Sequence, residues 1–335
     1  MLQVTNVIRS GFLIIKERFP PLPLLALDAC ISRLPEGHPK LTYLRQEAAK
    51  YQKGFNGERK LDYYLRSLDN DFAILNDITL SVNGIQFQID SLIVTSVAIY
   101  IIEVKSLDGI VRFDTGLKQL TQSNGEILIG RKYPITQVEN IAFLLMRWLQ
   151  QKKLNGLSIY YFIAIADHHT VIQVTGEEKL VTKVVTYADE IPMRVMKTNE
   201  KLKQLKAENR ALRNRVVQTM MQNREELNIE MLSKAGIDKN DIIPGVHCEN
   251  CNKLGMIRKR YKWYCSNCRY HSYTAHKKAL LDYALIFDRE ITNQSCQQFL
   301  QISRQTAYTI LKITNGVELA PNKRKWLLDV ERLRS

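Results

Sequence analysis

Residues 84–105 read as two β-rich segments that carry acidic groups inside an otherwise apolar pattern. In the second segment, the alternation of a strand places Glu103 and Lys105 side by side on one face. Asp90 ends the first segment, and pairing of the two segments brings its carboxylate close to Glu103. The chain is therefore expected to build a sheet with charged groups gathered at the end of neighbouring strands.

Two carboxylates beside an ammonium group are suited to a hard cation. Mg²⁺ usually binds one or two carboxylates and keeps waters and substrate phosphates as its other ligands. A bound Mg²⁺ lowers the pKa of a water and neutralises charge that develops on a phosphate. Lys105 is placed to orient that water or to stabilise the transition state. The alternative interpretation of Glu103 and Lys105 is an ordinary salt bridge on an exposed strand face.

Two helical patterns direct polar side chains toward the same region. Gly54-x-x-Gly57-Glu58 precedes a pattern that places Glu58 on the same stripe as several leucines. A carboxylate on an apolar stripe costs free energy unless it is paired or bound to a metal. Pro134 opens a second helix whose apolar stripe begins with the amide of Gln137. Both helices therefore present a polar group where apolar groups are expected.

Over about residues 45–190 the chain resembles the NERD (nuclease-related domain) family, a branch of the PD-(D/E)xK restriction-endonuclease-like nucleases. The matching residues are Gly54, Gly57, Glu58, Gln88, Ile89, Asp90, Glu103, Val104, Lys105, Pro134 and Gln137. The resemblance implies that Asp90 and Glu103 hold a divalent metal, Mg²⁺ or Mn²⁺, and that Lys105 assists the nucleophilic water. It also implies that Glu58 belongs to the site and that Gln137 orients it or contacts substrate. The Val104 carbonyl is a further candidate metal ligand.

The predicted elements favour an α/β domain over residues 43–190. Residues 72–82 read as a strand, and Asn83-Gly84 is a strong hairpin signal. Residues 157–166 form a nearly continuous apolar run, as expected for a strand buried on both faces. We expect a restriction-endonuclease-like mixed sheet flanked by helices. The polar stretch 115–130 is expected to be an exposed hairpin or loop near the site.

The segments on either side of this domain are predicted to be helical. Residues 1–42 contain five prolines, and we expect them to form an extension of short helices and turns packed on the nuclease domain, without chemistry of their own. Residues 194–235 form a long helical pattern within a connector over 191–240. Its apolar spacing, with Asn209 at a core position, allows two interpretations: a short coiled-coil seam in a homodimer, or a helix packed on its own domain.

Four of the six cysteines form two C-x-x-C pairs, namely Cys248, Cys251, Cys265 and Cys268. Two such pairs supply four thiolates for a tetrahedral Zn²⁺ site, and a closed four-sulfur site leaves no open position for catalysis. We therefore expect a structural zinc ribbon over residues 241–275. Paired C-x-x-C motifs favour metal binding in a reducing compartment over disulfides, which predicts a cytoplasmic protein.

The charge balance favours a polyanionic partner, because the net charge is +14 and the pI is near 9.4. The region between the cysteine pairs interleaves cations with aromatic residues, and the cations are Arg258, Lys259, Arg260 and Lys262. This pattern fits phosphate contacts plus base stacking. The alternative is a solvated basic hairpin whose aromatic residues cover a small core.

The last segment, residues 276–335, contains a pattern similar to a helix-turn-helix over residues 291–313. Thr292 or Asn293 caps a first helix, and Ser303 caps a second. The second helix carries residue types that read base edges and phosphates, namely Arg304, Gln305, Thr306 and Tyr308. Gln301 stands at the turn, where such motifs often have glycine, and a plain helical hairpin is the alternative.

Together these patterns predict a metal-dependent nuclease that hydrolyses phosphodiester bonds in DNA and binds DNA through its C-terminal unit. The alternative is a catalytically silent DNA-binding or regulatory protein that has a nuclease-like domain. No segment approaches the run of about 18 apolar residues that a membrane span requires, so we expect no membrane partner.

Overall fold

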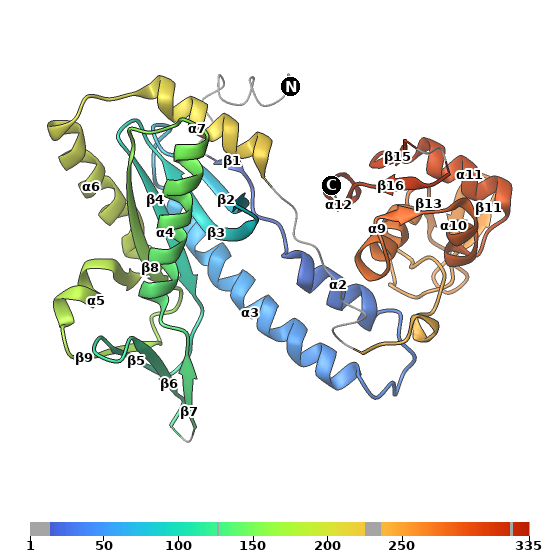
Figure 1. Ribbon diagram of the computed structural model, residues 1–335. Helices are drawn as coiled ribbons and strands as arrows, with labels where there is room; N and C mark the ends of the chain where they lie inside the picture. Colours follow the sequence, from blue (N-terminus) through green and yellow to red (C-terminus); the bar gives the residue numbers. More distant parts are fainter. Residues whose placement is uncertain (1–13, 126, 225–235, 322–323, 335) are drawn as a thin grey trace. The chain divides into compact units, whose positions relative to one another are not determined.

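The computed structural model describes residues 14–125, 127–224, 236–321 and 324–334 (Figure 1). This part of the chain forms two compact units. The first unit contains residues 14–19 and 53–224, and the second contains residues 20–52 and 236–334. The division between residues 52 and 53 lies inside a single helix, α3 (Leu41–Leu65).

The first unit is built on a six-stranded sheet in the order β1-β2-β3-β4-β8-β10 (Figure 1). The strands are β1 (Ile14–Lys16), β2 (Ala73–Val82), β3 (Ile85–Val94), β4 (Ala98–Lys105), β8 (Ser158–Ile165) and β10 (Val185–Tyr187). Strands β2, β3 and β4 are antiparallel, whereas β8 runs parallel to both β4 and β10, and β1 runs parallel to β2. The predicted mixed α/β fold is confirmed.

Helices cover both faces of this sheet. On one face, α4 (Pro134–Gln151) and α7 (Arg210–Asn223) pack their apolar residues against β2, β3 and β4. On the other face, the sheet packs against the end of α3 and against α6 (Ile191–Leu205). The shorter α5 (Glu178–Val184) and the 3₁₀ helix η1 (Ala188–Glu190) lie between β9 and α6 in the sequence. Among the described helices, none has both the length and the apolarity needed to cross a membrane.

A second, four-stranded sheet in the first unit has the order β7-β6-β5-β9. Its strands are β5 (Ile110–Asp114), β6 (Gln119–Ser123), β7 (Leu128–Arg131) and β9 (Val171–Thr175). The predicted hairpin over 115–130 is therefore part of a sheet that also includes β9, which follows β8 in the sequence. Phe113 and Leu120 join the core beneath it, whereas the β7 strand is exposed along its whole length.

The predicted long helix over 194–235 is divided into two helices, α6 and α7. Asn209 does not occupy a core position in a seam, because it caps the start of α7 by accepting a hydrogen bond from the Leu212 amide at 2.8 Å. Leu202 and Val216, which belong to the predicted seam, are buried on opposite faces of the first unit's sheet. The interpretation of these residues as one continuous coiled-coil seam was therefore wrong. The described part of the connector packs on its own domain instead. Residues 225–235 of the predicted helix lie outside the described residues, and dimerisation stays a prediction.

The second unit contains six helices and two small sheets among its described residues, besides the beginning of α3. The helices are α2 (Leu22–Ile31), η2 (Lys239–Asp241), α9 (His276–Ile286), α10 (Asn293–Leu300), α11 (Arg304–Ile313) and α12 (Val330–Arg334). One sheet joins β11 (Ile257–Lys259), β12 (Lys262–Tyr264) and β13 (His271–Ser272). The other has the order β14-β16-β15, from β14 (Glu290–Ile291), β15 (Val317–Leu319) and β16 (Trp326–Leu328).

The N-terminal segment packs only in part where we expected, since β1 joins the sheet of the first unit. We predicted that residues 1–42 would lie on the nuclease domain, but α2 buries Leu24 and Leu27 in the core of the second unit. Arg33, which follows α2, forms a buried ion pair with Asp282 of α9 at 2.9 Å. The contact joins residues that lie 249 positions apart in the chain, which no local sequence pattern reports.

Candidate active site and metal centre

The hairpin of β2 and β3, together with β4, brings Asp90 and Glu103 together. The pairing of β3 with β4 matches Ser91 to Ile102, so that Asp90 lies beside Glu103 one position further along. The Val104 amide donates a hydrogen bond to Oδ2 of Asp90 at 2.9 Å. The predicted proximity of the two carboxylates is therefore present in the structure, and a backbone group of β4 fixes the aspartate.

Glu103, Lys105 and Gln137 form a triangle of direct hydrogen bonds. The Lys105 ammonium donates to Oε1 of Glu103 at 2.6 Å, and Nε2 of Gln137 donates to the same oxygen at 2.7 Å. Lys105 also donates to Oε1 of Gln137 at 3.0 Å. The side chain of Glu103 is only 5% exposed, so the arrangement is not an exposed salt bridge. The first turn of α4 thus holds the acid and the lysine in fixed positions.

Glu58 reaches this region from α3, where Gly57 allows a close approach to the sheet. A β-carbon on Gly57 would lie 2.8 Å from Cβ of Ser106 and 3.0 Å from Cβ of Ala166. These two residues directly follow β4 and β8. Gly57 therefore lets the helix carry Glu58 to the strand ends that hold the other acidic residues.

Sequence reasoning missed Arg18, which makes the largest set of contacts near the site. Its guanidinium is 2% exposed and forms ion pairs with Glu58 at 2.7 Å, Asp62 at 2.8 Å and Asp77 at 2.8 Å. It also donates to the Asp90 carbonyl at 2.9 Å. We expected no chemistry from residues 1–42, but β1 pairs with β2 and delivers Arg18 to these acidic residues. No motif or spacing in the sequence marks this arginine.

Burial raises the pKa values of the acidic residues, and for Glu58 and Glu103 the nearby charge of Asp90 adds to this effect. Burial and then the charge of Asp90 raise the pKa of Glu58 to about 8, although Arg18 acts in the opposite direction. Burial and Asp90 likewise raise the pKa of Glu103 to about 7, against the lowering effect of Lys105. Burial also raises the pKa of Asp90. The anionic forms destabilise one another, which is the electrostatic situation that a divalent cation relieves.

The oxygen atoms that remain also fit a hard cation. In the part of the chain that the structure describes, no hydrogen bond is made by Oδ1 of Asp90, Oε2 of Glu103 or Oε1 of Glu58. Each carboxylate therefore keeps one oxygen for a ligand, as Mg²⁺ requires. These acidic groups are not gathered into as tight a ligand cluster as the four cysteines of the second unit.

The family comparison bears directly on this arrangement. Residues 53–166 match the model of the NERD family, described as the nuclease-related domain. The chain contains a NERD domain. The match lies within residues 45–190, where we expected it, and it includes Glu58, Asp90, Glu103, Lys105 and Gln137. Arg18 precedes the match, and no curated protein and no solved structure matches the chain.

A groove of about 650 Å³ opens beside the NERD site. Gln137 lines it, so the groove leads directly to the side chain that contacts Glu103 and Lys105. Its wall also contains Lys118, which precedes β6, and Lys132, which precedes α4. Neither lysine forms an ion pair with any described residue. Two cations that pair with no described carboxylate therefore flank the approach to the candidate active site.

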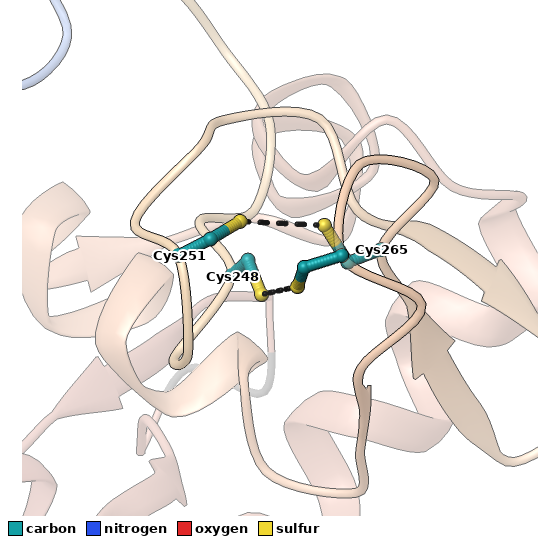
Figure 2. Close-up of side chains that lie close together, drawn as sticks. Cys248, Cys251 and Cys265 are labelled. Carbon is teal, nitrogen blue, oxygen red and sulfur yellow. Dashed lines mark hydrogen bonds between the residues drawn. The ribbon is translucent and has the colours of Figure 1, made fainter.

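In the second unit, the four predicted cysteines come together. Figure 2 shows the sulfur atoms of Cys248, Cys251 and Cys265 pointing toward one another. The Sγ atoms of Cys248 and Cys268 are 3.5 Å apart, those of Cys251 and Cys265 are 3.7 Å apart, and all four lie within 4.8 Å of one another. Hydrogen bonding from the Lys253 amide lowers the pKa of Cys251 to about 6. The donor set and its compactness fit a closed four-thiolate zinc site.

The basic hairpin of β11 and β12 differs in part from our expectation. Trp263, which we expected to be available for base stacking, is fully buried in the core. Arg258 lies over its ring at 5.3 Å, and Lys259 lies over the Tyr264 ring at 4.6 Å. Tyr261, at the turn, is 79% exposed. Trp263 therefore serves the core of the second unit, while the predicted cations Arg258, Lys259, Arg260 and Lys262 line the hairpin.

The helices α10 and α11 begin after the predicted caps, Thr292 and Ser303. The Ser303 side chain caps α11 by accepting a hydrogen bond from the Thr306 amide at 3.2 Å. Gln301 has a φ of 55°, so it adopts the left-handed conformation for which such turns often use glycine. Arg304, Gln305 and Tyr308 are exposed on α11, and Thr306 is half-buried. The described geometry thus leaves the predicted contact residues at one end of the second helix.

Proposed function

We propose that this protein is a metal-dependent nuclease that hydrolyses phosphodiester bonds in DNA. The observation that carries the proposal is the triangle of Glu103, Lys105 and Gln137 beside Asp90 inside a NERD domain. Asp90 and Glu103 would hold Mg²⁺ or Mn²⁺, with the Val104 carbonyl as a further ligand. When bound, such an ion would polarise the phosphodiester and acidify a coordinated water.

The chain's own residues then have distinct tasks. The Lys105 ammonium, fixed by Glu103 and Gln137, orients the attacking water and stabilises the charge that develops on the phosphate. Gln137 holds both side chains in place, because its amide nitrogen donates to Glu103 and its amide oxygen accepts from Lys105. Glu58 supports the ion or its water from α3. The adjoining groove would hold the DNA backbone, with Lys118 and Lys132 neutralising phosphates next to the scissile one.

The second unit is proposed to hold DNA. The four cysteines would bind a structural Zn²⁺ that stabilises the basic hairpin. Arg258, Lys259, Arg260 and Lys262 would contact phosphates, and the exposed side chains of α11 would contact DNA as the second helix of a helix-turn-helix does. The capping of α11 and the left-handed turn at Gln301 support this assignment.

Cleavage of plasmid and linear DNA tests the nuclease proposal. We expect the wild-type protein to cut in Mg²⁺ or Mn²⁺ and to stop when a chelator is added. Glu103→Gln and Asp90→Asn keep the shape of each side chain but remove its charge, so cleavage should be lost in both. Cleavage by Glu103→Gln at the wild-type rate would contradict the assignment of the site.

Retardation of a DNA duplex tests the DNA-binding proposal separately. In the Glu103→Gln background, which prevents cleavage, Arg304→Ala should weaken binding and lower the salt dependence by about one phosphate contact. Lys312→Ala, at the opposite end of α11, is the matched control and should have a smaller effect. Equal effects of the two substitutions would contradict the docking of α11 by its first turn.

A further inference from the structure

Arg18 occupies the side of the candidate active site that faces Glu58. Its guanidinium binds Oε2 of Glu58 while it also pairs with Asp62 and Asp77, and its other amino group donates to the Asp90 carbonyl and to Oγ of Ser91. A planar guanidinium with five donors can satisfy several oxygens at once in a fixed geometry. Arg18 is therefore a built-in cation inside the acidic cluster.

The charges around the site leave room for one divalent ion. Five carboxylates meet there, namely those of Glu58, Asp62, Asp77, Asp90 and Glu103. Three cations face them, namely Arg18, Lys105 and, beside Asp77, Lys16. When all five carboxylates are ionised, five negative charges against three positive charges leave two negative charges, which one divalent cation balances. A second such ion would leave an excess of positive charge in a buried place.

The hydrogen bonds of the carboxylates also favour a single divalent ion. A two-metal site holds its ions about 3.5–4 Å apart, and we expect a carboxylate that bridges them to use both of its oxygens. Here Oδ2 of Asp90 accepts from the Val104 amide, and Oε1 of Glu103 accepts from Lys105 and Gln137. Oε2 of Glu58 is bound by Arg18. Each carboxylate therefore has one oxygen that makes no hydrogen bond with the described residues, which favours a single ion over a bridged pair.

We propose that Arg18 takes the place of a second metal ion and limits the NERD site to one divalent cation bound between Asp90 and Glu103. This inference rests on the proposed metal-dependent function. Arg18 acts as a positioning residue, because it neutralises Glu58 and fixes the Asp90 backbone without contacting the reacting atoms. The NERD match begins at residue 53, so Arg18 lies outside the matched region.

The number of Mn²⁺ ions bound by the full-length, zinc-loaded protein tests the inference without any catalysis. Titration followed by calorimetry and by the EPR signal of free Mn²⁺ should give one ion per chain. Glu103→Gln should lower the affinity for that ion by about tenfold or more, because it removes the charge of a ligand. Two ions of comparable affinity in the wild-type protein would overturn the inference, whereas no bound ion would also overturn the proposed function.

Substitution of Arg18 tests its part directly. Arg18→Met removes the charge, keeps an apolar stem and frees Oε2 of Glu58, and it raises the uncompensated negative charge from two to three. We therefore expect the first Mn²⁺ to bind more tightly, and a second Mn²⁺ to bind more weakly than the first. Arg18→Lys keeps the charge and should retain one ion. Arg112→Met is the matched control, because it removes a positive charge from the same unit at an arginine that bonds to Gln173. A single ion of unchanged affinity in a folded Arg18→Met protein would overturn the role of Arg18.

A second variant keeps the test decisive if Arg18→Met does not fold. The double substitution Asp62→Asn and Asp77→Asn removes two negative charges that pair with Arg18 and leaves the proposed ligands intact. If the charge balance sets the affinity, the single Mn²⁺ should bind about tenfold more weakly or worse. An unchanged Mn²⁺ affinity would contradict the charge argument.

Discussion

Gln137 makes two opposite contacts, since its amide nitrogen donates to Glu103 and its amide oxygen accepts from Lys105. Gln137→Ala removes both, so we expect kcat for DNA cleavage to fall by about 10- to 100-fold, the usual cost of losing a group that orients site residues. Gln151→Ala, at the other end of α4, removes a contact with Asn83 and is the control. Equal kcat values for the two variants would contradict an orienting role for Gln137.

His276 gives the second unit a pH dependence. Trp263 Nε1 donates to Nδ1 of His276 at 3.1 Å, and Nε2 of His276 lies 3.1 Å from Oγ1 of Thr314, so the ring is neutral. Burial lowers the pKa of His276 to about 4, from an ordinary value of 6.5. The unfolded chain therefore takes up a proton first as the pH falls, and stability is lost between about pH 6.5 and 4. The expected loss is on the order of 3 kcal/mol.

Hydrogen exchange of the β12 and α9 amides at several pH values measures this effect. His276→Asn keeps an acceptor for Trp263 and removes the titrating group, so its stability should fall less between pH 6.5 and 4 than that of the wild type. Competition of protons with zinc affects both proteins alike, and the difference between them isolates His276. Identical pH profiles would refute the assignment.

At the scale of single residues, the sequence predicted what a local pattern can encode. Strand alternation and strand pairing predicted that Lys105 and Asp90 lie next to Glu103. The role of Gln137 at the site was expected only from the resemblance to the NERD family. Arg18 was not found, because it reaches the site through the pairing of β1 with β2, which are separated by more than fifty residues. A solitary arginine just after a short strand has no periodicity to mark it.

At the scale of elements, Gly57 and Gly54 form a matched pair within α3. Gly57→Ala would place a methyl group 2.8 Å from Cβ of Ser106, so the helix must shift away from the ends of β4 and β8. Such overpacking typically costs about 1–3 kcal/mol, and the shift would also displace Glu58. We expect Gly57→Ala to lower both the free energy of unfolding and the cleavage rate.

Gly54→Ala is the control for this prediction, because no atom lies within 4 Å of the added carbon. Alanine replaces glycine there inside a helix, so the protein should gain about 0.5–1 kcal/mol. Denaturant unfolding of the three proteins gives the comparison. A Gly57→Ala protein as stable and as active as Gly54→Ala would refute the close packing of α3 against the strand ends.

The connector shows what periodicity leaves undetermined in an element. The apolar spacing over 194–235 describes a stripe, but a stripe can face a second chain or the chain's own sheet. Asn209 was assigned to a seam, although an asparagine before a helical run is equally a helix cap. The described helices α6 and α7 bury their apolar stripes on opposite faces of the six-stranded sheet in the first unit. Only the tertiary structure distinguishes these outcomes.

At the scale of the whole molecule, the order of segments along the chain does not show which segments fold into the same unit. We predicted five consecutive segments, whereas the described chain divides into two units that each take residues from both sides of α3. The burial of Leu24 and Leu27 with α9, and the Arg33–Asp282 ion pair, place the N-terminal helix with the C-terminal residues. Apolar residues in a short helix do not specify which distant core they join.

Removal of zinc should affect one unit. Cys248 and Cys265 are buried in the core of the second unit, and thiolates held without an ion repel one another. A strong zinc chelator, or Cys265→Ser, should therefore speed hydrogen exchange in β11, β12 and α9, while the NERD sheet keeps its protection. Atomic absorption should give one zinc per untreated chain. Unchanged exchange after complete removal of zinc would contradict a structural role.

The most direct test of the account is cleavage of supercoiled plasmid by the wild-type protein and by Lys105→Met, with Mg²⁺ present and DNA retardation recorded in parallel. We predict nicking or degradation by the wild type, a fall of at least about 100-fold in Lys105→Met, and equal retardation of the DNA by both. Equal cleavage by the two proteins would contradict the proposed site. Intact plasmid that both proteins retard would instead indicate a DNA-binding protein whose NERD domain is catalytically silent.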